Sequence, residues 1–191
     1  MLRSVIGERV RARRHARGLT LDALAERSGI SRRMLVNVEQ GVTNPSIATL
    51  LRLSEALAIG LPDLVAPHDA EARLEVNRAG DRPPLWTGES GGQAFLAAGV
   101  AAPDAVELWD WTLAPGDAHA SEPHVAGTRE LLVAIEGEMV LSVAGEEAVL
   151  RTGDAASFRG DTVHGYRNDG SAVARFVLTV FEPPAGTEAQ T

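Results

Sequence analysis

Residues 20–41 read TLDALAERSGISRRMLVNVEQG and predict two short helices joined by a tight turn. Thr20 and Ser31 are residue types that cap helix N-termini, and Gly29 can adopt the positive φ that a sharp reversal needs. Apolar residues recur at helical spacing on both sides of this glycine, so each helix has one apolar face. The stretch therefore predicts a helical hairpin whose apolar faces meet in a core.

The second predicted helix keeps a polar face in solvent. Arg32, Arg33 and Asn37 lie opposite the apolar positions Leu35 and Val38. Arginine can bind both acceptors of guanine, and asparagine can pair with adenine, so this face can read a DNA major groove. The alternative is an ordinary helical hairpin with a solvated basic face.

The longer stretch 9–65 resembles the Cro/repressor-type helix-turn-helix domain of the xenobiotic-response-element (XRE) family. The matching residues are Arg14, Gly18, Leu19, Thr20, Leu24, Ala25, Gly29, Ser31, Glu39, Gly41, Asn44, Pro45, Leu50 and Leu57. The resemblance implies an all-α bundle of five helices, with the helix after 45 opening on a proline in its first turn. It also implies that Arg14 pairs with Glu39 inside the bundle.

The same resemblance implies which residues contact DNA. Arg32, Arg33 and Asn37 would touch bases, while Ser31 and nearby backbone amides would hold phosphate. Thr20 completes the predicted DNA-binding set.

Charge divides the chain in two. Residues 1–66 contain 10 arginines and 6 acidic residues, whereas residues 67–191 contain 8 arginines and 20 acidic residues. The first part can therefore approach DNA phosphates, which would repel the second part. We expect a DNA-binding domain at 1–66, a linker at 67–73, a β-barrel at 74–182 and a disordered tail at 183–191.

The lack of cysteine and the lack of an apolar run at the start of the sequence restrict the class of protein further. The chain contains no cysteine, which excludes disulfides, thiolate catalysis and cysteine-based zinc fingers. Its first 18 residues contain no apolar run long enough for a signal peptide or a membrane span, so a cytoplasmic location is expected.

Short alternating segments replace helical periodicity after the linker. We expect strands at 71–78, 93–99, 106–114, 131–135, 138–144, 147–151 and 173–182. Many short strands separated by glycine-containing turns predict a sandwich or barrel. The last strand is apolar on both faces, which predicts a central position in its sheet.

Residues 115–139 and 153–168 resemble the paired motifs of the cupin superfamily, whose fold is an all-β jelly-roll barrel. The matching residues are Gly116, His124, Glu130, Gly137, Gly153, His164 and Asn168. Glu122 stands where the family has its first histidine, and Arg159 and Asp161 replace the usual proline and second glycine.

Glu122, His124, Glu130 and His164 are the candidate metal ligands. Residues two apart on a strand point the same way, so Glu122 and His124 are expected to enter the barrel mouth together. Imidazoles with carboxylates suit one Zn, Fe(II), Mn or Ni ion. In the alternative without metal, the same side chains hydrogen-bond an organic effector.

Other side chains are assigned to the wall or to the surface of the barrel. Tyr166 and Asn168 are expected to line the pocket, Trp109 and Trp111 to pack in the core, and His119 to lie at the surface.

Together, the two resemblances predict a sequence-specific transcriptional regulator whose barrel senses a small molecule or a metal. A homodimer would bind a pseudo-palindromic operator in double-stranded DNA. One alternative is an enzyme, because iron-dependent epoxidases of hydroxypropylphosphonate resemble this domain order and His124, His164 and Glu130 could form their facial triad. Another is a DNA-binding protein whose barrel only dimerises.

Overall fold

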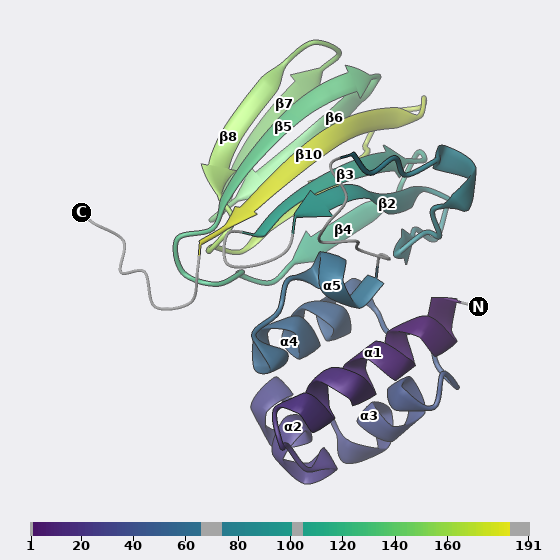
Figure 1. Ribbon diagram of the computed structural model, residues 1–191. Helices are drawn as coiled ribbons and strands as arrows, with labels where there is room; N and C mark the ends of the chain where they lie inside the picture. The colour runs from purple at the N-terminus through teal and green to yellow at the C-terminus, as the bar shows by residue number, and fades with distance from the viewer. Residues whose placement is uncertain (1, 66–73, 101–104, 184–191) are drawn as a thin grey trace. The chain divides into compact units, whose positions relative to one another are not determined.

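The computed structural model describes residues 2–65, 74–100 and 105–183, which form two compact units divided in sequence between Glu75 and Val76 (Figure 1). The predicted linker 67–73 lies outside the described residues, as do residues 184–191 of the predicted tail. None of the helices in the described ranges combines the length and the apolar composition needed to cross a membrane.

The first unit contains the five helices that the resemblance implied. They are α1 (Leu2–Ala16), α2 (Leu21–Ser28), α3 (Arg32–Glu39), α4 (Ile47–Leu57) and α5 (Leu61–Val65). The side chains of Thr20 and Ser31 accept hydrogen bonds from backbone N–H groups three residues further on, and Gly29 ends α2 with a φ of 64°. Pro45 is not in the first turn of α4 as expected, because Ser46 caps that helix.

The bundle core is mainly apolar, but it contains one ion pair. Its most buried side chains include Ile6, Val10, Leu24, Leu35, Val38, Leu50, Leu53, Leu57, Leu61 and Leu64. Arg14 Nε and Nη2 donate to Glu39 Oε1 and Oε2 at 2.6 and 2.9 Å, and each side chain is 8% exposed. Arg14 also donates to the carbonyl of Leu19 at 3.0 Å. The predicted pairing is confirmed, and it ties α1 to the end of α3.

The second unit consists of two antiparallel sheets, visible in Figure 1 as two layers of strands. The larger has the order β1 (Trp86–Thr87), β2 (Gln93–Val100), β3 (Ala105–Leu113), β10 (Ala174–Glu182), β5 (Arg129–Glu136) and β8 (Ala155–Arg159). The smaller has the order β4 (Ala118–Ser121), β9 (His164–Arg167), β6 (Glu138–Val143) and β7 (Glu146–Arg151). A short 3₁₀ helix, Ala79–Asp81, precedes them.

Most of the expected strands are present. The prediction at 71–78 is wrong over its described part, residues 74–78, where Leu74 and Val76 are exposed and make no ladder. Strands β1, β4, β8 and β9 were not predicted, because they are short and mix small, polar and aromatic residues without an apolar alternation.

Strand β10 is central, as predicted, and it organises the interior. It pairs with β3 on one side and β5 on the other, and Phe176 and Val180 are buried on its inner face. Trp111 stacks on Phe176 with ring centroids 5.7 Å apart, which confirms that Trp111 is a core residue. The register places Glu107 of β3 and Glu130 of β5 on either side of Val180.

Candidate functional sites

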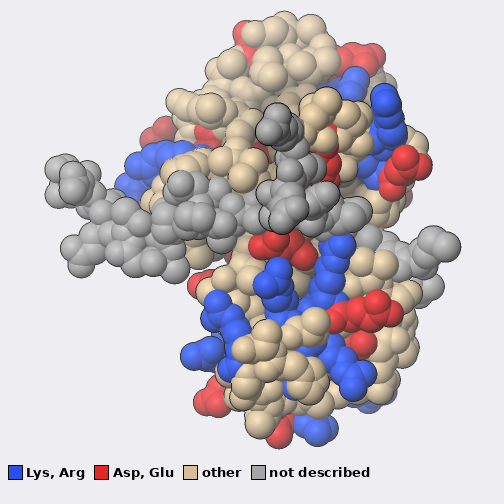
Figure 2. Space-filling view, viewed as in Figure 1, with Lys and Arg blue, Asp and Glu red and all other residues tan. Residues whose placement is uncertain are grey.

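The face of α3 that was predicted to read DNA is exposed. Arg32 and Arg33 lie in solvent and Asn37 is half-buried, while Leu35 and Val38 on the opposite side are buried. Arginine side chains gather on the helical unit in the space-filling view (Figure 2). This arrangement leaves the two guanidinium groups accessible to base edges and phosphates.

Several side chains of the predicted DNA-binding surface are held by ion pairs or hydrogen bonds within the helical unit. Arg32 Nε forms an exposed ion pair with Asp22 Oδ1 of α2 at 2.8 Å, so a DNA phosphate would have to compete with this carboxylate. The Ser31 hydroxyl accepts from the backbone of Met34 at 3.1 Å. Its oxygen is the acceptor in that bond, so its proton can be donated to phosphate. Thr20 is exposed and caps α2 in the same way.

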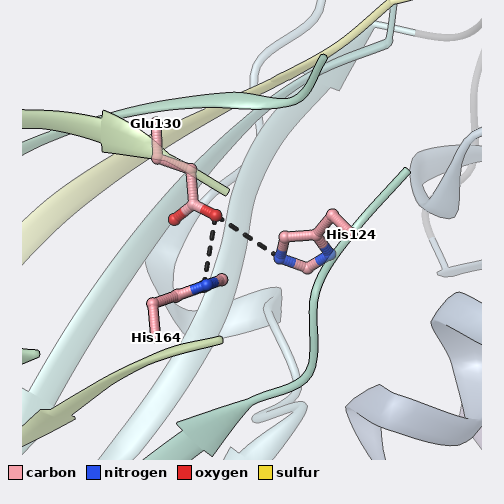
Figure 3. Close-up of side chains that lie close together, drawn as sticks. All are labelled: His124, Glu130 and His164. Carbon is pink, nitrogen blue, oxygen red and sulfur yellow. Dashed lines mark ion pairs between the residues drawn. The ribbon is translucent and has the colours of Figure 1, made fainter. Parts of the chain in front are cut away.

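Inside the second unit, three side chains from separate segments converge (Figure 3). His124 lies in the loop after β4, Glu130 on β5 and His164 at the start of β9. Their ligand atoms all lie within 4.8 Å of one another. Glu130 Oε1 is 3.4 Å from His124 Nε2 and 3.2 Å from His164 Nε2.

Glu122 does not join this cluster. It is exposed, and the group of converging ligand atoms consists of His124, Glu130 and His164 alone among the described residues. The expectation for Glu122 assumed that residues 122–124 continue a strand. Strand β4 ends at Ser121, so the two-residue alternation no longer orients Glu122 and His124 together.

The Nε2 atom of His164 points its lone pair at the carboxylate of Glu130. His164 Nδ1 lies 2.8 Å from the carbonyl oxygen of Thr162, and because a carbonyl can only accept, Nδ1 carries the proton. Nε2 of the neutral ring is then an acceptor that points at another acceptor, Glu130 Oε1. Both atoms are buried without a hydrogen-bond partner in the described structure. A cation between them, or the proton of an uncharged Glu130, would satisfy both.

Burial favours the uncharged forms of all three side chains. It lowers the pKa of His124 to about 4, lowers that of His164, and raises the pKa of Glu130 to about 7. The hydroxyl of Tyr166 opposes the last shift by donating to Glu130 Oε2 at 3.0 Å. Neutral imidazoles are the form that binds metals, so the histidines are ready to ligate without losing a proton.

The distances from Glu130 Oε1 to the two histidine nitrogens also fit a metal. Ligand atoms that lie 2.0–2.2 Å from a common ion, at angles of about 90–110°, are roughly 2.8–3.6 Å apart. The measured separations of 3.2 and 3.4 Å fall in this range. Two histidines and a carboxylate suit Zn, Fe(II), Mn or Ni.

Comparison with known proteins agrees with both halves of this description. The helix-turn-helix family matches residues 10–64 and the cupin domain family matches residues 109–181. HTH-type transcriptional regulator SutR of Escherichia coli is 26% identical over 173 residues, which cover 89% of this chain and 90% of SutR. The uncharacterized HTH-type transcriptional regulator y4dJ of Sinorhizobium fredii is 35% identical over 68 residues, which cover 36% of this chain and 88% of y4dJ.

A solved structure extends the similarity to the whole chain. The crystal structure of an HTH_3 family transcriptional regulator from Vibrio cholerae matches with a TM-score of 0.75 and 27% identity, over 96% of this chain and 98% of that one. This chain belongs to the XRE-family HTH-type transcriptional regulators that carry a cupin domain.

The two predicted pocket residues of this regulator have different roles in the fold. Tyr166 is buried beside the triad and donates to Glu130. Asn168 is buried in the turn after β9, where Nδ2 donates to the carbonyls of Leu113 and Ala172 and Oδ1 accepts from Gly170. Because these bonds hold the turn together, we leave Asn168 out of the proposed pocket.

Sequence reasoning misplaced His119 in this regulator. Its ring lies 4.9 Å from that of Trp111 and is stacked on Tyr166 at 6.4 Å, so it belongs to the barrel wall and not to the surface. Burial lowers its pKa to about 4. The signal was hidden because β4, the strand that turns His119 inward, was not predicted.

Glu107 was overlooked as well. It is 2% exposed and occupies the same inner row of β3 as Trp109, whose Nε1 donates to Glu107 Oε2 at 2.9 Å. The sequence did contain a signal for it, because Glu107 alternates with Trp109 and Trp111 and therefore shares their inward-facing side of the strand.

Proposed function

We propose that this regulator binds a specific DNA operator through α3 and that its barrel senses a metal ion, a small molecule or both. The observation that carries the proposal is the triad of Glu130, His124 and His164, buried in a chain whose other unit exposes a helix-turn-helix. Two buried acceptors of the triad, Glu130 Oε1 and His164 Nε2, have no hydrogen-bond partner, and a ligand that completes them would remove that cost. Acting on chromosomal DNA, the regulator would be located in the cytoplasm.

For DNA binding, the proposal assigns base contacts to Arg32, Arg33 and Asn37, and phosphate contacts to Ser31 and Thr20. Support comes from the exposure of the arginines and from the buried side of α3, which fixes the helix on the bundle. The predicted position of Ser31 at the start of α3 also puts backbone N–H groups where helices bind phosphate.

For sensing, the proposal assigns one divalent ion to His124, Glu130 and His164, with Tyr166 orienting the carboxylate. The ion would supply a positive centre to which an organic effector could also bind. The coupling required between the two units is modest, since about 1–3 kcal/mol changes DNA affinity about 5–150-fold.

A homodimer would match a pseudo-palindromic operator, and the larger sheet offers a surface for it. On the outer face of β5, Leu131 and Ile135 are 58% and 42% exposed, and Val133 between them is also exposed. Across the register, Leu131 lies in line with Leu108 of β3. In Figure 2 this region is a largely uncharged surface with charged residues at its borders.

Charge complementarity favours a second copy of this chain as the occupant of that face. Arg129 stands at one end of the row on β5 and Glu136 at the other. A two-fold axis near Val133 would bring Arg129 toward the partner's Glu136 on both sides. Leu131→Asp should convert the dimer to monomer in analytical ultracentrifugation, whereas Val149→Asp, at an exposed site on β7 of the other sheet, should not. A monomeric wild-type protein would contradict the assignment.

The first experiment is binding of the purified full-length protein to fragments of its own genomic DNA, with and without Zn²⁺, Fe²⁺, Mn²⁺ or Ni²⁺. A few enriched sites that share a pseudo-palindrome, and whose enrichment changes with one of the metals, are the expected result. Replacing His124 and His164 should preserve basal binding and abolish the response. No enrichment under any condition would refute the DNA-binding part.

One observation favours a second function. Two histidines and one carboxylate form the facial triad of non-haem iron oxygenases, and Glu122 does not crowd it. In that case the protein with Fe²⁺ would consume oxygen in the presence of a substrate, and Glu130→Gln would stop the consumption. The enzyme reading gives the exposed arginines of α3 no role, so we rank it second.

A further inference from the structure

Glu107 lies in the interior of the barrel but outside the triad. Its side chain is 2% exposed on β3, and the sheet register separates it from Glu130 by a single intervening residue, Val180 of β10. Since directly paired residues of neighbouring strands face the same side, Glu107 and Glu130 point into the same space. Glu107 is not one of the three converging metal ligands.

One oxygen of Glu107 is held and the other is left open. Oε2 accepts the indole N–H of Trp109 at 2.9 Å, which orients the carboxylate. Oε1 is buried and has no hydrogen-bond partner among the described residues. An oriented, buried carboxyl oxygen without a hydrogen-bond partner is a feature of sites that receive a ligand.

The two charged groups that shift the pKa of Glu107 are both carboxylates. Burial and, to a smaller extent, the carboxylates of Glu182 and Glu130 together raise its pKa to about 8, although the hydrogen bond from Trp109 acts in the opposite direction. Glu182 also raises the pKa of Glu130. The chain contains no lysine, and among the described residues no arginine is a cause of either pKa shift. A protonated amine would stabilise the ionised form of Glu107 that these surroundings disfavour.

We propose that Glu107 Oε1 receives a protonated amine of the effector, beside the metal triad. The inference rests on the proposed sensing function and specifies the chemical class of the effector: a small organic cation with at least one N–H donor. Trp109 supplies the orientation of the carboxylate, and a charge-assisted hydrogen bond supplies selectivity over neutral and acidic analogues.

The test uses full-length protein and three matched sets of probes: short primary amines from methylamine to 1,4-diaminobutane, the corresponding alcohols, and the corresponding carboxylic acids. Binding is measured by calorimetry and by the shift in melting temperature. We expect amines to bind and the other two sets not to bind. Glu107→Gln keeps an acceptor for Trp109 and should reduce amine affinity about 10–100-fold. Glu138→Gln, at an exposed ion pair with Arg151, should leave it unchanged.

Metal binding gives the second measurement. Glu107→Gln should retain the metal affinity of the wild type, which also shows that it folds. If it loses the metal as Glu130→Gln does, Glu107 is a metal ligand and the inference is wrong. An unchanged amine affinity in Glu107→Gln, a preference for acids or alcohols, or no response to any amine would overturn it too.

Failure of this inference is distinguishable from failure of the regulator. Operator binding is measured on the same preparations. If an operator is found and amines do not bind, only the effector class is wrong. If amines bind through Glu107 and no operator is found, the effector class stands and the DNA-binding proposal fails.

Discussion

Gly160 lies directly against the carboxylate of Glu130: a Cβ atom at residue 160 would be 2.5 Å from Oε1. The carbonyl of Gly160 also accepts the backbone N–H of His124 at 2.9 Å, and its own N–H donates to Thr128 at 3.1 Å. One glycine therefore brings two of the three proposed ligands together, and it can do so because it has no side chain.

Gly160→Ala should damage the triad without unfolding the barrel. The added methyl group would collide with Glu130 and with Thr128 Cγ2, 2.8 Å away, so the carboxylate must move. We expect at least a roughly tenfold loss of metal affinity in calorimetry, comparable to losing an outer-shell partner. Gly80→Ala is the control, since a Cβ there meets nothing within 4 Å. Equal metal affinity in the two variants would show that Glu130 is not a ligand.

Variants of the triad and its neighbours should separate the ligands from the residues that orient them. His164→Ala and Glu130→Gln should abolish metal binding, whereas Tyr166→Phe should weaken it by about 10–100-fold because it frees Glu130 to rotate. Glu122→Gln should bind metal as the wild type does, because Glu122 is outside the cluster. Titration with Zn²⁺ and Ni²⁺ measures all four. Loss of binding in Glu122→Gln would restore the original four-ligand expectation.

Arg33→Ala should weaken specific operator binding by about 1–3 kcal/mol if its guanidinium reads a base. The effect on non-specific DNA should be smaller, because base contacts supply sequence preference and phosphate contacts supply general affinity. Gel-shift titrations at fixed salt compare the two substrates. Arg151→Ala, an exposed arginine of the other unit, is the control for loss of positive charge. Equal loss in both variants would exclude base reading by Arg33.

Glu39→Ala should destabilise the helical unit by about 3–5 kcal/mol, because it leaves the Arg14 guanidinium buried without its partner. Asp22→Ala removes the exposed pair with Arg32 and should cost less than about 1 kcal/mol. Urea unfolding followed by circular dichroism provides both values. Similar stabilities for the two variants would mean that the buried pair contributes no more than a surface one.

The contribution of Glu107 to the stability of the metal-free protein should fall as the pH rises from about 4.5 to about 8, whereas the lowered pKa values of His119 and His124 act in the opposite direction below about pH 6.5. The pKa of Glu107 is raised from 4.5 to about 8 by burial, so the folded protein binds more protons than the unfolded chain across that range. Glu107→Gln should flatten the dependence and stabilise the protein above pH 8, by on the order of a few kcal/mol. Glu130 acts in the same direction, so part of the slope should remain.

Thermal unfolding across this pH range, in the presence of a chelator, measures the effect. Glu138→Gln provides a control at an exposed position of the same unit. An identical pH profile for wild type and Glu107→Gln would show that Glu107 is not held in its protonated form by the fold.

Much of the helical unit could be predicted because its signals are local. The caps Thr20 and Ser31 and the turn at Gly29 act within a few residues of themselves, and apolar spacing defines the buried side of each helix. The pairing of Arg14 with Glu39 spans 25 positions, and it was predictable only from resemblance to other proteins.

The barrel site shows where such local reasoning ends. His124, Glu130 and His164 were named from motif spacing, but Glu122 was included with them because strand alternation was extended past Ser121. His119 was predicted at the surface because strand β4, which turns its ring inward, was not predicted.

The sequence by itself determined the kinds of unit in this protein: a helix-turn-helix with exposed arginines, followed by short strands carrying histidines and carboxylates. Only the tertiary structure decided which of those polar groups share a space. Glu107 and Glu130 are 23 positions apart in the chain, yet β10 sets them on either side of one residue. Periodicity along a strand reports which face a residue occupies, whereas neighbours across strands depend on register, which distant segments determine by packing.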